Sequence, residues 1–282
     1  MDGFIRHWCK LITLCCVLLT SACSGTTFVY NRLDFILPWY VDDYAELNGE
    51  QEAYLDELLA PFLAWHRTRE LPQYVATLDR IERSLDQPLT ADEIASIWID
   101  FEQAWFRLEA ESLDWLLALG AHLSDKQMEG FLEVLWERQR EYEEEYLERS
   151  DEDFYEDSYD NLKDSASDYL GRLSGEQREL LRAGSLQLMR SDAAWLTERA
   201  IWLERLAVML QREPGWQDRV REAVAQRNDT LSDDYLKTYE HNLAVLYEVI
   251  ASLVNSRTEK QDRHLRNKLS RLREDLETLI AQ

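Results

Sequence analysis

The chain has 282 residues, of which 45% are hydrophobic and ten are tryptophan, and its formal net charge is −24 at pH 7. This composition is typical of a chain that buries a packed core, so it excludes an intrinsically disordered protein. The negative charge repels phosphate groups, so we expect no partner among nucleic acids and no charge-driven binding to anionic lipid.

The first 22 residues predict a secretory signal peptide. Arg6 and Lys10 form a positive start, and the apolar stretch at 11–19 is shorter than the roughly 20 residues of a membrane span. The run Leu19-Thr20-Ser21-Ala22-Cys23 then resembles the lipobox of bacterial lipoproteins. That resemblance implies removal of residues 1–22 and attachment of three acyl chains, palmitate among them, to Cys23. The alternative is an ordinary signal peptide that is cut after Ala22.

The residue after Cys23 is Ser24 rather than aspartate, which in Gram-negative lipoproteins implies the periplasmic face of the outer membrane. The remaining cysteines, Cys9, Cys15 and Cys16, belong to the expected signal peptide. We therefore expect a mature protein that has no thiol for disulfides, for cysteine catalysis or for cysteine-bound zinc.

The segment 23–46 is expected to be a lipidated N-terminus followed by an aromatic stretch. Its candidate partner-binding residues are Tyr30, Arg32, Asp34, Trp39 and Tyr40. Tryptophan and tyrosine concentrate at the headgroup level of membranes, and they also line grooves that bind peptides. The third possibility is a first helix that packs onto the body of the protein.

Apolar residues recur every three or four positions in most of the remaining chain, which predicts helices. One example is the run of Trp98, Phe101, Trp105 and Leu108, and another is the leucine series that starts at Leu265. No segment alternates every two residues, so we expect no sheet. The predicted fold class is all-α, an elongated multi-helix bundle of about eight to ten helices. Pro61 falls inside one helical stretch, where we expect a kink or a break.

Helix starts are marked by a short phrase, a leucine followed by Ser, Thr or Asn and, three residues later, by Gln or Glu. This pattern predicts capping boxes at Asn48, Thr90, Ser124, Ser174 and Thr258. The spacing of the phrases suggests two tandem related halves, 47–171 and 172–282. The second half would carry an insertion near Asn228-Asp229 that splits the counterpart of the first half's longest helix.

The acidic run at 141–160 is a candidate patch with Glu144, Glu148, Asp151, Asp153 and Asp157 at its centre. Like charges this dense repel each other, and three arrangements would relieve the repulsion. The run could hold a cation, although it lacks the glycine of an EF-hand loop. It could lie beside the basic stretch at 257–273 if the helices that start at Ser124 and Thr258 are neighbours. The simplest arrangement is a solvated polar face.

No catalytic or metal-binding motif is present in the sequence. The histidines of the mature chain do not stand at metal-ligand spacing, and no phosphate loop, dinucleotide fingerprint or serine-hydrolase elbow occurs. We therefore expect no metal, no cofactor, no small-molecule substrate and no enzymatic activity.

The lipobox, Tyr30-Asn31-Arg32-Leu33-Asp34, Pro38-Trp39-Tyr40 and Trp65-His66-Arg67 together resemble a family of uncharacterised Gram-negative lipoproteins, classed as a domain of unknown function. The helix-start phrases at 47–51, 123–127 and 173–177 are also similar to those of small helical periplasmic stress chaperones that carry Leu-Thr-x-x-Gln repeats. The first resemblance brings no known activity, and the second would imply binding of unfolded clients.

These observations lead to an expected function of an outer-membrane-anchored periplasmic lipoprotein with a non-catalytic binding or structural role. Its partners would be the membrane, through the lipid, and a basic envelope protein. Two alternatives stay open: a chaperone-like or assembly factor, and an envelope enzyme that works through carboxylates.

Overall fold

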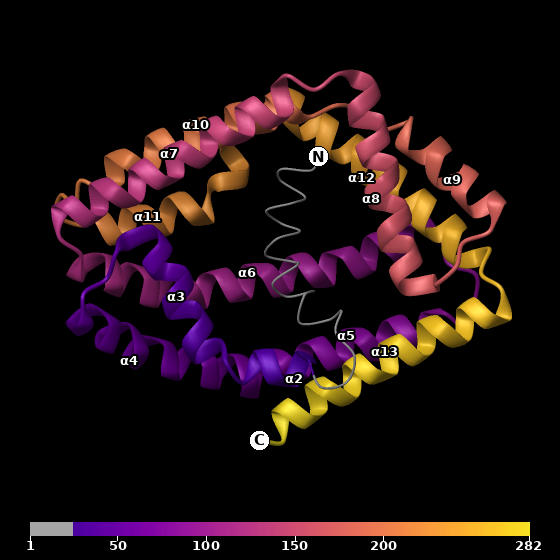
Figure 1. Cartoon of the computed structure of the whole chain (residues 1–282), viewed down its shortest axis with the longest axis horizontal. Helices are drawn as coiled ribbons and strands as arrows, with labels where there is room; N and C mark the ends of the chain where they lie inside the picture. The colour runs from indigo at the N-terminus through magenta and orange to yellow at the C-terminus, as the bar shows by residue number, and fades with distance from the viewer. Residues whose placement is uncertain (1–24) are drawn as a thin grey trace.

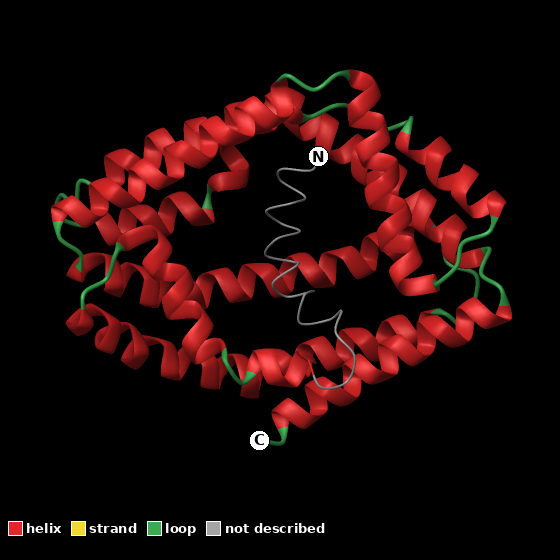
Figure 2. Ribbon diagram, in the orientation of Figure 1, coloured by secondary structure: helices red, strands yellow, loops and turns green. Residues whose placement is uncertain are grey.

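The computed structural model describes residues 25–282, and this part of the chain is helical with no strand (Figure 2). The all-α expectation is therefore confirmed. The expected signal peptide and Cys23 lie outside the described residues.

The described α-helices are more numerous than the eight to ten expected, because short helices flank the long ones. In chain order the elements are α2 (Gly25–Tyr30), α3 (Leu33–Ala45), α4 (Gly49–Trp65), the π-helix η1 (His66–Glu70), α5 (Leu71–Ser84), α6 (Ala91–His122), α7 (Asp125–Leu147), α8 (Asp151–Leu170), α9 (Gly175–Ser185), α10 (Asp192–Met209), α11 (Trp216–Ala225), the 3-10 helix η2 (Arg227–Thr230), α12 (Asp233–Asn255) and α13 (Glu259–Ile280).

The helices form a broad, open frame that the longest helix, α6, crosses through the middle (Figure 1). The continuous run α4–η1–α5 forms one long side of the frame together with α13, and α7 and α10 form the opposite side. α12 packs against α6 and against α9. The expected break at Asn228-Asp229 falls within η2, between α11 and α12.

Helices of each proposed half pack on helices of the other half. α13 lies along α5 and also contacts α8, whereas α7 lies along α10 and also contacts α3. Residues 47–171 and 172–282 are therefore interlocked and do not form two separate bodies. The origin of the halves by duplication stays a prediction.

Capping boxes form at all five predicted starts, and a sixth forms at Ser150. In each box a side-chain oxygen of the cap residue accepts a hydrogen bond from a backbone amide of the first turn. Two cap glutamines also bond to each other across the fold. Gln51 Nε2 lies 3.0 Å from Gln127 Oε1, and Gln127 Nε2 lies 2.8 Å from Gln51 Oε1.

The core is divided into several clusters of buried apolar side chains. The largest joins α5, α9 and α13 around Leu71, Leu181 and Leu279. A second lies between α4 and the end of α6, and a third gathers around Trp195 of α10. Pro61 does not end α4, which continues to Trp65, so no break occurs there.

Candidate functional site

Helices α2 and α3 expose an aromatic face to solvent. Phe28 is 59% exposed, Phe35 71% and Trp39 63%. Phe35 and Trp39 are four positions apart on α3, so they share one face of the helix. The guanidinium of Arg32 lies over the Phe28 ring, 4.8 Å from its centroid. We call Phe28, Phe35 and Trp39 the aromatic face.

Of the other candidate residues here, Asp34 and Tyr40 are exposed, as expected for a surface site. The Tyr40 hydroxyl hydrogen-bonds to that of Tyr44, and the Tyr44 ring lies beneath the Arg138 guanidinium. Tyr30 is different, because only 4% of it is exposed. Its burial removes it from any partner-binding surface and makes it part of the packing.

Tyr30 joins the N-terminal segment to the body of the protein. Its hydroxyl lies 2.9 Å from His66 Nδ1, and the Arg67 guanidinium lies over its ring. Burial raises the pKa of Tyr30 to about 12. Arg67 also donates a hydrogen bond to Asn31, which in turn donates one to Gln282 at the end of the chain. These contacts hold α2 in a defined position on η1 and α13.

His66 opens the π-helix η1, and it is buried among aromatic rings. The rings of Phe62, Trp65 and Tyr74 lie within 6.4 Å of the imidazole, measured between centroids. Burial lowers the pKa of His66 to about 4, so the imidazole is neutral at pH 7. A π-helix is rare and occurs often at functional sites. Here its widened turn places His66 against Tyr30 and Glu70 against α6.

Glu70, at the other end of η1, is buried, and both of its carboxylate oxygens are hydrogen-bonded. Its two carboxylate oxygens accept hydrogen bonds from Arg107 of α6, with Nη2 2.6 Å from Oε1 and Nε 2.9 Å from Oε2. A bidentate pair of this kind fixes the carboxylate geometrically. It ties the middle of α6 to the edge of the frame.

The acidic candidates lie around the turn between α7 and α8. Glu144 and Glu148 are exposed. Asp153 closes the capping box of Ser150, which lowers the pKa of its carboxyl. Asp151 pairs with Arg190 at 3.0 Å and Asp157 with Arg149 at 3.1 Å. The aspartates of the patch therefore stabilise the turn between α7 and α8, whereas its glutamates form an exposed acidic surface.

The buried centre of this region is Asp192, which the sequence analysis did not single out. Arg149 Nη2 lies 2.7 Å from Asp192 Oδ1, and Arg190 Nε lies 2.9 Å from Asp192 Oδ2. Burial alone would raise the pKa of Asp192, but the hydrogen bonds from Arg149 and Arg190 outweigh it and lower the pKa below its ordinary value. The Arg149 guanidinium also lies over the Tyr146 and Phe154 rings. No motif or spacing in the sequence marks Asp192.

The basic stretch at 257–273 meets α5 rather than the acidic run. Arg273 contacts Asp79 and Glu82 at 3.2 and 3.1 Å, and Arg266 contacts Asp86 at 2.9 Å. The expectation that the helices starting at Ser124 and Thr258 lie side by side is wrong, because α7 packs on α3 and α10 while α13 packs on α5 and α8.

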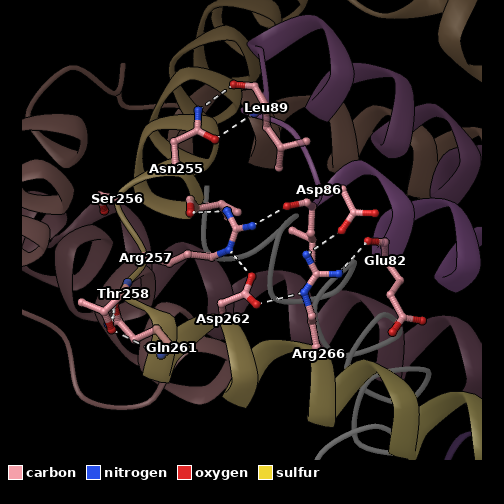
Figure 3. A network of polar contacts seen from close by, with 12 residues as sticks. Glu82, Asp86, Leu89, Asn255, Ser256, Arg257, Thr258, Gln261, Asp262 and Arg266 are labelled. Carbon is pink, nitrogen blue, oxygen red and sulfur yellow. Dashed lines mark hydrogen bonds and ion pairs between the residues drawn. The ribbon is translucent and has the colours of Figure 1, made fainter.

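A polar network joins the α5–α6 turn to the α12–α13 turn (Figure 3). The Asn255 side chain bonds to both the amide and the carbonyl of Leu89 at 2.8 Å. Arg257 donates hydrogen bonds to the Leu85 carbonyl and to the Asp262 carboxylate. The bond from Arg257 lowers the pKa of Asp262. A hollow of about 420 Å³ adjoins the network, but its arginines and acids, Arg257, Glu259, Asp262 and Arg263, form ion pairs with each other. The network therefore has a structural role, because it holds the two interhelical turns together.

Within residues 25–282, no group of three or more His, Cys, Asp or Glu side chains is arranged to hold a metal ion. In the same range, no helix combines the length and the apolar character of a membrane span.

A comparison with family models matches residues 43–236 to DUF6279, a family of unknown function. The chain belongs to this family. The expected membership in a domain of unknown function is confirmed at this level. No curated protein and no solved structure matches the chain. The DUF6279 match includes His66, Glu70, Arg107, Arg149 and Asp192, whereas Tyr30 and the aromatic face precede it.

Proposed function

We propose that the chain is a lipoprotein anchored through Cys23 at the periplasmic face of the outer membrane, with a non-catalytic binding or structural role. The observation that carries this proposal is the aromatic face, which begins at Phe28, close behind Cys23 in the sequence. A lipid on Cys23 would hold this face within reach of the bilayer surface.

The chemistry of the aromatic face suits the interface of a membrane. Aromatic rings, and tryptophan above all, favour the headgroup level. Stable anchoring by lipid takes more than one signal, and buried aromatic surface adds to the acyl chains. Tyr30 attaches the N-terminal segment to the helical body through His66 and Arg67. Contact of the aromatic face with lipid would therefore orient the whole helical body relative to the membrane.

The carboxylate-enzyme alternative is less well supported by the geometry. It predicts two buried carboxyl groups in one cleft with raised pKa values. Within residues 25–282, the two carboxylates with the lowest exposure are Glu70 and Asp192. They belong to separate ion pairs with arginines, and the pKa of Asp192 is lowered.

The anchor is tested by expressing the full chain in a Gram-negative host with radiolabelled palmitate. We expect label in the wild-type protein, none in Cys23→Ser, and recovery of the labelled protein with outer-membrane fractions. An unlabelled wild-type protein with an unmodified N-terminus would overturn the proposal.

The orientation is tested with single thiols in the lipidated protein, since residues 24–282 contain no cysteine. Phe35→Cys and, as a matched control on another face, Leu186→Cys are reacted with a membrane-impermeant maleimide in proteoliposomes. Leu186 is 60% exposed, so the two thiols start from similar accessibility. Relative to an unlipidated chain that starts at residue 24, we expect the membrane to slow only the thiol at position 35. Equal slowing at both positions, or none, would argue against membrane contact by the aromatic face.

A further inference from the structure

A groove lies between α7 and α10, helices that do not include the aromatic face. The two helices run antiparallel, because Gln139 bonds to the Leu196 carbonyl while Arg190, just before α10, bonds to the Tyr146 carbonyl near the end of α7. The hollow between them has a volume of about 350 Å³. Its lining residues are Glu143, Leu147, Ala193, Leu196, Thr197, Ala200, Ile201 and Glu204.

Most of the residues that line the groove are apolar, and several have short side chains. Ala193, Thr197 and Ala200 recur at helical spacing on α10, and their short side chains leave room for the side chains of another helix. Two larger apolar residues stand at its edges, Leu147 of α7 at 47% exposure and Ile201 of α10 at 37%. The spacing of these positions suits one helix laid along the seam, with anchors at positions i, i+3 or i+4, and i+7.

The edges of the groove are acidic. Glu143 of α7 and Glu204 of α10 line it from its two sides. Farther round α7, the exposed acids Glu144 and Glu148 form no ion pair within the described residues. Arg140 and Arg205 are the exposed arginines of these two helices, so the charge around the groove is predominantly negative. Such a surface repels anionic lipid, nucleic acid and a second copy of this acidic chain.

We propose that this groove binds one amphipathic helix of a basic protein. Leucine-like side chains of the partner would pack beside Ala193, Thr197 and Ala200. Lysine or arginine side chains that flank the partner's apolar face would pair with Glu143 and Glu204. The apolar floor provides the affinity and the acidic edges select the charge of the partner. The inference names the chemistry of the partner, and it does not depend on lipidation at Cys23.

The test measures the affinity of fluorescent peptides for the detergent-solubilised full chain by anisotropy. The probe is a leucine–lysine peptide of about 18 residues, roughly five helical turns, with an amphipathic sequence order. A peptide of identical composition in scrambled order controls for attraction by net charge alone. We expect the amphipathic peptide to bind at least about tenfold more tightly than the scrambled one, a difference of about 1.4 kcal/mol.

Variants of the groove decide whether it is the binding site. Ala200→Trp fills the groove, and Ala244→Trp is the matched control at an exposed alanine of α12. We expect Ala200→Trp to weaken the amphipathic peptide by about tenfold and Ala244→Trp to change its binding less than about twofold. Ile201→Ser, which removes an apolar side chain from the groove edge without adding bulk or charge, repeats the test should Ala200→Trp unfold the protein. The double change Glu143→Gln with Glu204→Gln should weaken binding more than Glu176→Gln with Glu240→Gln on other helices.

Three results would overturn the proposal. One is that the amphipathic peptide binds no more tightly than the scrambled one, because charge alone would then account for any binding. Another is unchanged binding in folded Ala200→Trp and Ile201→Ser proteins. The third is a wild-type dimer in sedimentation that Ala200→Trp abolishes, because the occupant would then be a second copy of the chain.

Discussion

Gln177 and Gln261 form a closed pair of hydrogen bonds between α9 and α13, two helices of the second proposed half. Gln177 Nε2 lies 3.1 Å from Gln261 Oε1, and Gln261 Nε2 lies 2.8 Å from Gln177 Oε1. Each glutamine also closes the capping box of its own helix, at Ser174 and at Thr258. The same arrangement joins Gln51 to Gln127 in the first proposed half. In both pairs, the glutamine that closes a capping box also ties its helix to another helix.

We predict that Gln177→Ala and Gln261→Ala each lower the free energy of unfolding by about 2 kcal/mol, roughly 1 for the cap and 1 for the lost amide bond. Both residues are buried, so the remaining partner loses a bond that water cannot readily replace. The double variant should lose less than the sum of the single losses, because the two residues share one interaction. Urea denaturation of the four proteins measures this coupling.

The control for the glutamine pair is Gln187→Ala, since Gln187 is exposed and its side chain bonds only to the Ala183 carbonyl of the preceding helix. We expect a change within about 0.5 kcal/mol there. Strict additivity of Gln177→Ala and Gln261→Ala would contradict the pairing.

Gly184 of α9 packs directly against Val249 of α12. A Cβ atom at this position would lie 2.4 Å from Cγ2 of the buried Val249. Valine is stiff at χ1, so it cannot turn away freely. We predict that Gly184→Ala destabilises the protein by about 1–3 kcal/mol through overpacking, although alanine is the better helix former. Thermal unfolding followed by circular dichroism measures the change.

The matched control for Gly184 is Gly130→Ala in α7, where a Cβ would meet nothing within 4 Å. There we expect a gain of up to about 1 kcal/mol from helix propensity alone. Adding Val249→Ala to Gly184→Ala should recover part of the loss. If the double variant loses as much stability as the two single variants together, the clash is not the cause.

Local features of the fold were predictable from the sequence, because a capping box involves residues three positions apart. The starts at Asn48, Ser124 and Ser174 illustrate this. The packing of α13 on α5 was not predictable, because basic side chains at helical spacing are equally compatible with any acidic neighbour. The pairing of Arg273 with Asp79 and Glu82 is decided by long-range packing that the pattern does not contain.

The candidate surface was predictable only in part. The sequence shows that the segment at 28–44 is rich in aromatic residues, but it leaves open which of them are exposed. Trp39 and Tyr40 are exposed, whereas Tyr30 is buried. Aromatic side chains suit a core and a surface equally well, and the choice at Tyr30 depends on the π-helical turn that presents His66. Asp192 was missed because its charge is inconspicuous in so acidic a chain.

Asp192 compensates a guanidinium that is almost fully buried. The Arg149 side chain is 7% exposed, and the Asp192 carboxylate is its buried partner. We predict that Asp192→Asn lowers the free energy of unfolding by about 3–5 kcal/mol, because it leaves a buried positive charge without its counter-ion. Guanidinium chloride unfolding of the two proteins measures the loss.

Asp157→Asn is the matched control for Asp192→Asn, since Asp157 contacts the same Arg149 from the exposed side. An exposed pair contributes at most about 1 kcal/mol, so this loss should be small. Equal losses in the two variants would refute a special role for the buried carboxylate. Because the pKa of Asp192 is lowered in the folded protein, its contribution is present above the unfolded pKa and disappears as the pH falls through the folded pKa.

His66 should make stability depend on pH between neutrality and pH 5. Its pKa is about 4 in the folded protein, against 6.5 for an exposed histidine, because burial disfavours the imidazolium. Between these two values the unfolded chain binds a proton that the folded chain does not, so stability falls as the pH is lowered. We predict a loss of about 2 kcal/mol from pH 7 to pH 5 that is attributable to His66. In His66→Gln, which keeps a polar partner for Tyr30, this part of the slope should vanish even though the variant is less stable at pH 7. Urea unfolding of both proteins at several pH values isolates the difference, and parallel slopes would show that the buried imidazole does not resist protonation.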